Sequence, residues 1–121
     1  MSRSKDFDRL ADVAQLMLDT RLAQLREVSA QLDRSRKQLA ALNAAARPSD
    51  LPLVAAEKVG LVYDRWADVR RSELNLVVAR QTAEWIETRA EAGTAFGRLQ
   101  SLKGLEDRLK GKRCADPVVS A

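Results

Sequence analysis

Apolar residues recur along the first third of the chain with the spacing of a coiled coil. No glycine or proline occurs from Lys5 to Ala46, which predicts one long helix over about 5–46. Leucines return every seven residues on this helix, while alternate positions of the same stripe are polar. The stripe consists of Leu18, Leu25, Leu32 and Leu39, with Leu22, Val28 and Leu42 beside them and Ser29, Arg36 and Asn43 as the polar positions. A helix this long needs a packing partner along its length.

A turn should follow at 47–52. Pro48 disfavours helix at Arg47, whereas Pro52 suits the first turn of a new helix that Ser49 or Asp50 could cap. A short connection between two long helices brings the second back antiparallel to the first. The pattern therefore predicts an all-α fold, an elongated antiparallel two-helix coiled-coil hairpin that spans 1–121 as a single module.

The second helix is expected over about 53–110, followed by a flexible tail at 111–121. Its large apolar residues recur every eleven residues, which nearly completes three helical turns and keeps them on one face. They are Tyr63, Leu74, Trp85 and Phe96, with Trp66, Val77 and Leu99 forming a second series through Thr88. The simplest interpretation is that these residues fill the seam of the hairpin. The sharper one is that Trp85 or Phe96 anchors a partner protein.

A turn centred at 49–50 also predicts the register of the hairpin. Leu25 would lie opposite Leu74, and Leu18 opposite Gln81, so that the first helix ends before it reaches 95–110. Apolar residues in this overhang need a cover. The expected partner-binding residues are Trp85, Phe96, Leu99, Leu102, Leu105 and Leu109. The glycine stripe there, Gly97, Gly104 and Gly111, fits either a close-packed partner helix or a frayed end that a complex orders.

Composition and charge narrow the function classes. The hydrophobic share is 45% and the aromatic share only 4%, which favours extended helices over a globular core. The net charge is +4, but acidic and basic residues alternate and only the end of the chain is clearly basic, so nucleic acid is not the expected partner. No run approaches the ~18 apolar residues of a membrane span. We expect a cytoplasmic protein without membrane insertion.

The sequence contains no constellation that suggests catalysis. It has no histidine, and its single cysteine, Cys114, lies near the end of the chain. Glu84, Glu87 and Glu91 share one helical side but lack a matching acidic cluster opposite, so a solvated face is the simpler interpretation. Gly93 and Gly97 interrupt a helical pattern and do not form a phosphate-binding loop after a strand. We expect no enzyme, no metal and no other cofactor.

One stretch of the second helix resembles a known family. The residues at 79–85 (Ala-Arg-Gln-Thr-Ala-Glu-Trp) and at 91–98 (Glu-Ala-Gly-Thr-Ala-Phe-Gly-Arg), followed by Leu102, are similar to the late second helix of the flagellar type III export J protein family. Members of that family are two-helix coiled coils that resemble the gamma stalk of rotary ATPases. They sit in the ring of the flagellar export ATPase and contact the export gate. The resemblance implies a stalk or escort subunit of type III export, peripheral to the membrane-bound apparatus.

The alternatives are also binding proteins. A generic helical adaptor or secretion chaperone could bind another helix, or a second copy of this chain, through the C-terminal leucines. A third hypothesis, a small nucleic-acid-associated protein, is supported only by the basic end of the chain, from Lys103 to Arg113.

Overall fold

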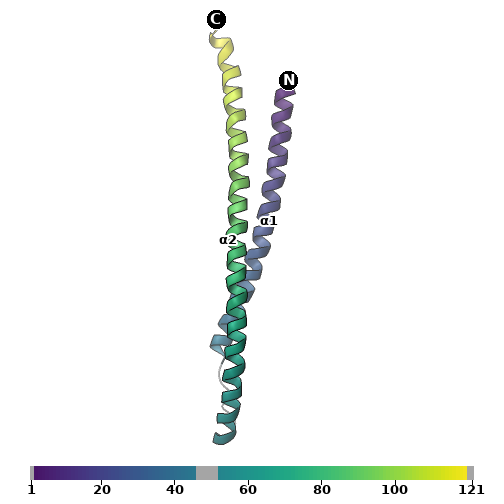
Figure 1. Ribbon diagram of the computed structural model, residues 1–121. Coiled ribbons are helices and arrows are strands. Elements are labelled where there is room, and N and C mark those ends of the chain that lie inside the picture. The colour runs from purple at the N-terminus through teal and green to yellow at the C-terminus, as the bar shows by residue number, and fades with distance from the viewer. Residues whose placement is uncertain (1, 46–51, 120–121) are drawn as a thin grey trace. The chain divides into compact units, whose positions relative to one another are not determined.

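The chain folds as a two-helix hairpin. The computed structural model describes residues 2–45 and 52–119, and side chains at 3–45 and 52–111. These residues form α1 (Ser2–Ala44) and α2 (Leu53–Val119), and the described part of the chain contains no strand (Figure 1). The predicted all-α antiparallel hairpin is confirmed.

The helix ends differ in detail from the expected ones. α1 begins at Ser2 and ends at Ala44, after which the Ala45 N–H donates to the Leu42 carbonyl at 3.4 Å. α2 begins directly after Pro52, whose carbonyl accepts a hydrogen bond from the Ala56 N–H at 2.7 Å. Proline suits this place because the first N–H groups of a helix have no partner within it. The expected caps Ser49 and Asp50 lie outside the described residues, as does all of 46–51.

α2 runs on to Val119, beyond the end expected near Lys110. The glycines in the described residues have no positive φ, so they continue the helix instead of ending it. A glycine inside a helix costs only about 1 kcal/mol relative to alanine, which a long helix tolerates. Residues 111–119 therefore belong to α2, and 120–121 lie outside the described part.

The hairpin consists of two compact units, each built from a segment of both helices. We call Met1–Arg26 with Glu87–Ala121 the terminal unit, and Glu27–Ile86 the central unit. In the terminal unit the first part of α1 packs against the last part of α2, and in the central unit the later part of α1 packs against the earlier part of α2 (Figure 1).

The predicted register is wrong by about four helical turns. Leu18 was expected opposite Gln81, but it lies in one buried cluster with Ala95 and Leu99. In the central unit, Arg71 donates a hydrogen bond to Asn43 at 2.8 Å, although the predicted turn places Asn43 opposite the very start of α2. The first turns of α2 therefore extend past the end of α1, and 95–110 is not an overhang.

Burial of apolar surface explains this register. In the predicted register, with the turn centred at 49–50, the leucine-rich end of α2 would remain in water. Burying this end against α1 stabilises the fold by roughly 25 cal/mol for each Å² of apolar surface removed from water. Leu99 is buried, Leu102 packs against the same cluster, and Glu106 and Leu109 lie beside Phe7 of α1. The hydrophobic pattern of both helices, and not the shortness of the connection, decides which residues meet.

Candidate partner-binding surfaces

The interior of the terminal unit consists mainly of alanine and leucine, with Thr88 as a buried polar residue. Ala14 and Leu18 from α1 form a buried cluster with Ala95 and Leu99 from α2, and Leu102 packs against its edge. Small residues in a seam let two helix backbones approach closely, and a leucine fills the space beside each alanine. This inner surface is already occupied by the chain itself and offers nothing to a partner.

Charged pairs border this interior. The Arg21 guanidinium donates to the Glu91 carboxylate at 2.9 Å across the two helices, and both side chains are part-exposed. Farther along α2, the ammonium of Lys110 lies 3.0 Å from a carboxylate oxygen of Glu106. This hydrogen bond, and then the negative charge of Glu106, raise the pKa of Lys110. The first pair joins the two helices and the second lies within α2, as expected for charges that flank a coiled-coil seam.

The interior of the central unit mixes apolar and polar side chains. Val28, Leu32, Ala67 and Leu74 are buried together with Ser35. The indole N–H of Trp85 donates to the Ser29 hydroxyl at 2.9 Å, joining α2 to α1. The Tyr63 hydroxyl and the side-chain Oε1 of Gln81 are buried, and neither has a hydrogen-bond partner among the described residues.

The six residues expected to bind a partner separate into inward and outward sets. Leu99 is 5% exposed, Leu102 packs against the buried cluster, and Trp85 is half-buried with its indole bonded to Ser29. These three hold the hairpin together, so the premise that 95–110 lacks a cover is wrong for them. The outward set, in which the side chains remain exposed, comprises Phe96 and Leu105, whereas Leu109 is 37% exposed and lies beside Phe7 of α1 at the edge of the seam.

The eleven-residue series divides in a similar way. Tyr63, Leu74 and Trp85 face the interior as predicted, whereas Phe96 is exposed and its neighbour Ala95 occupies the core position. In the second series Thr88 and Leu99 are buried, but Trp66 is 56% exposed. Trp66 therefore lies outside the inner seam, although the simplest interpretation of the sequence placed it there.

The glycine stripe of α2 does not contact another helix of this chain. A methyl group added at Gly93, Gly97, Gly104 or Gly111 would meet no atom within 4 Å. Close helix packing on these glycines would leave no such room. Within the hairpin they therefore lie on an open face.

α1 leaves an apolar face open in the terminal unit. Leu10, Val13, Leu16 and Met17 are exposed, at spacings of three and four residues that place them on one side of the helix. Val13, Leu16 and Met17 line a shallow depression together with the polar side chains of Thr20, Arg21 and Gln24. We call Leu10, Val13, Leu16 and Met17 the α1 face.

α2 carries a longer open stripe in the central unit. Its members alternate by three and four residues, the spacing of a coiled-coil seam, and all of them are exposed. Glu73 occupies the one charged position of the stripe. We call this set the outer seam: Val59, Val62, Trp66, Val69 and Leu76. The sequence already contains this spacing, but our prediction assigned Trp66 to the inner seam because of the eleven-residue series and so missed the outer seam.

Other kinds of site find no support in the described residues. Over these residues no helix has both the length and the apolar character to cross a membrane. Nor does any group of three or more Cys, Asp and Glu side chains there have the arrangement to hold a metal ion. Comparisons with known protein families, with curated proteins and with solved structures found no match to this chain.

Proposed function

We propose that this chain is a non-enzymatic coiled-coil protein that binds other proteins through helix faces on the outside of its hairpin. One observation carries the proposal. The inner seam is filled by the chain's own residues, while large apolar side chains remain exposed on both helices, among them Leu16 and Trp66. Contiguous exposed apolar faces on a helix are typical of surfaces that receive a second helix.

The most specific form of this proposal is a stalk or escort subunit of flagellar type III export. Its support is the similarity of 79–85 and 91–98 to the export J family, together with the hairpin architecture. Several residues of the similar stretch, such as Trp85, Ala92 and Ala95, are buried or half-buried in the hairpin. Packing alone accounts for them, so the similarity supports the hairpin more strongly than it supports a particular partner.

In this form the terminal unit docks into the ring of the export ATPase. That unit contains Met1–Arg26 and Glu87–Ala121, and its exposed residues Phe96 and Leu105 are available to a partner. Phe96 and Leu105 are nine residues apart, which places them on opposite sides of the helix, about half a turn from each other. A single partner helix can therefore cover one of them but not both.

Co-purification with the flagellar export ATPase of the same organism tests this form. We expect wild type to bind, and either Phe96→Glu or Leu105→Glu to weaken binding at least about tenfold, the cost of burying one charge in an apolar contact. Gln38→Glu places the same charge at an exposed position of the central unit and serves as the control. A chain that does not bind the ATPase would overturn the export assignment. Unchanged binding by both variants would overturn these faces as the docking site.

A further inference from the structure

The outer seam is an exposed apolar stripe on α2 within the central unit. It runs from Val59 to Leu76, roughly 25 Å along the axis of α2. Val62 is 69% exposed, and Ala67 and Leu74, which face α1, are buried. We propose that the outer seam binds an amphipathic partner helix whose apolar stripe is flanked by acidic residues. This inference does not depend on the export ATPase, because it concerns the other unit.

The pattern of the outer seam is that of a coiled-coil interface. Val59, Trp66 and Glu73 occupy one heptad position, and Val62, Val69 and Leu76 the other. The next positions in the same series are Arg80 and Ala83, so the large apolar side chains stop there. The surface therefore accommodates a partner helix of about two to three heptads. Trp66 lies near its centre and is the expected anchor, since buried tryptophans often dominate such contacts.

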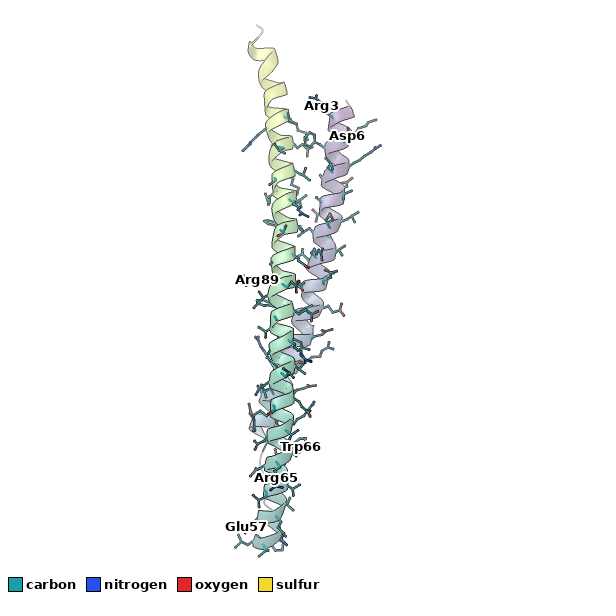
Figure 2. The ribbon with its side chains drawn as sticks, viewed as in Figure 1. Arg3, Asp6, Glu57, Arg65, Trp66 and Arg89 are labelled. Atoms are coloured by element: carbon teal, nitrogen blue, oxygen red, sulfur yellow. The ribbon has the colours of Figure 1, made fainter. Side chains whose placement is uncertain are left out.

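Charges beside the outer seam identify the chemistry of the partner. Lys58, Arg65 and Arg70 flank the apolar stripe at the positions that meet the edges of a partner helix. Figure 2 shows Arg65 next to Trp66 on this part of α2. The one acidic residue within the stripe, Glu73, forms an ion pair with Arg70 at 3.3 Å. The Glu73 carboxylate offsets the charge of Arg70, so Lys58 and Arg65 give the edges of the outer seam their net basic charge, and acidic edges on the partner would complement them.

The acidic residues of the same segment lie elsewhere on the helix. Asp68 pairs with Arg71 at 2.9 Å, and Arg71 in turn contacts Asn43 of α1, so this pair belongs to the side of α2 that faces α1. Glu57 and Asp64 are also outside the heptad positions and edges of the outer seam.

A second copy of this chain is a poorer occupant. Two outer seams packed on each other would bring Lys58, Arg65 and Arg70 of one copy close to the same residues of the other, and like charges at coiled-coil edges disfavour pairing. The α1 face does not supply uniformly acidic edges, because Lys5, Arg9 and Arg21 lie near it together with Asp6 and Asp12. The complementary helix is therefore expected from a different protein.

Titration of the full chain with two designed helical peptides tests the proposal. Both labelled peptides have leucine at the heptad core positions over about three heptads, and they differ only in carrying glutamate or lysine at every flanking position. We expect fluorescence anisotropy to show binding of the acidic peptide at least about tenfold tighter than that of the basic peptide. Lys58→Glu combined with Arg65→Glu should reverse this preference.

Two neighbouring residues provide a matched pair of variants. Val62 belongs to the outer seam, whereas Leu61 is 62% exposed and about 100° away around the helix. Val62→Gln should weaken binding of the acidic peptide at least about tenfold, and Leu61→Gln, which adds the same polar group without a charge beside Lys58 and Arg65, should leave it within about twofold. Neither position is buried, so both variants should fold as wild type does.

Three results would overturn the proposal. Equal binding of the two peptides would show that the basic flanks do not select an acidic partner. Equal effects of Val62→Gln and Leu61→Gln would show that the outer seam is not the binding surface. Sedimentation showing a dimer of wild type that Val62→Gln dissociates and Leu61→Gln does not would make a second copy the occupant. None of these results bears on the export ATPase, which is tested on the terminal unit.

Discussion

The terminal unit and the central unit use the same two helices but bury different kinds of side chain. Between its helices, the terminal unit packs Ala14 and Ala95 against leucines. The central unit buries Val28 and Leu32 beside polar groups, and it joins its helices through the hydrogen bond from Trp85 to Ser29. The first kind of interior depends on close fit, and the second on satisfying polar atoms.

This difference shows how a hairpin combines stability with a defined register. Alanine and leucine provide apolar burial, but such residues can pack in several registers separated by whole heptads. Directional hydrogen bonds remove that freedom, since Ser29 with Trp85 and Asn43 with Arg71 meet in one alignment only. A buried polar position in a coiled coil commonly fixes register at a cost in stability. Burial of leucines in the terminal unit therefore favours the alignments that cover them, and the hydrogen bonds of the central unit select one alignment among these.

The largest expected effect comes from a charge in the apolar part of the central unit. Leu32 is 4% exposed, so Leu32→Asp buries a carboxylate without a partner and should lower the free energy of unfolding by roughly 4 kcal/mol. Circular dichroism melts measure the change. Ala30→Asp, at an exposed position of the same helix, should cost only about 0.7 kcal/mol through helix propensity. Equal effects of the two variants would mean that Leu32 is not a core residue.

An intermediate effect should come from adding volume to the terminal unit. Ala95→Leu forces a larger side chain into the alanine and leucine cluster and should lower the free energy of unfolding by about 1–3 kcal/mol. Ala90→Leu makes the same change at an exposed position of the same segment and should be nearly neutral, because alanine and leucine have similar helix propensity. Chemical denaturation compares the two. A stabilising Ala95→Leu would show that the helices there are farther apart than a close-packed seam requires.

The fold was predictable because periodicity reports which face of a helix is buried. The leucine heptads of α1 identified its inner face correctly, since Leu18 and Leu32 are buried and Leu25 and Leu39 are half-buried. Two breaker-poor segments on either side of a proline-containing connection were then enough to predict the hairpin.

The register was not predictable in the same way. α2 carries apolar residues on its inner face and also on the outer seam, so α1 has more than one apolar surface to align with. The polar positions Ser29 and Asn43 looked like weak points of the α1 stripe, yet both form hydrogen bonds to α2. Sequence spacing cannot identify such pairs until the alignment is known.

The candidate surface depended on that register. Leu99 and Leu102 were expected to bind a partner because the symmetric turn left them uncovered, and the observed alignment places them in or against the buried cluster. Phe96 and Leu105 are exposed as expected, although that expectation was based on the same incorrect register. Their binding role stays a prediction.

The smallest expected changes in unfolding free energy come from removing single hydroxyl groups in the central unit, and their sign depends on whether the hydroxyl is hydrogen-bonded. The Tyr63 hydroxyl is buried without a hydrogen-bond partner among the described residues, so Tyr63→Phe removes a desolvated group and should raise the free energy of unfolding by up to about 1 kcal/mol. Ser29→Ala also removes a single hydroxyl, but this one accepts the hydrogen bond from Trp85, and its loss should lower the free energy of unfolding by about 1 kcal/mol. Urea denaturation of both variants measures the two signs against wild type. If Tyr63→Phe destabilises the protein as much as Ser29→Ala does, the Tyr63 hydroxyl is hydrogen-bonded in solution, for example to a bound water. The central unit would then satisfy more of its buried polar atoms than the contacts between its helices indicate.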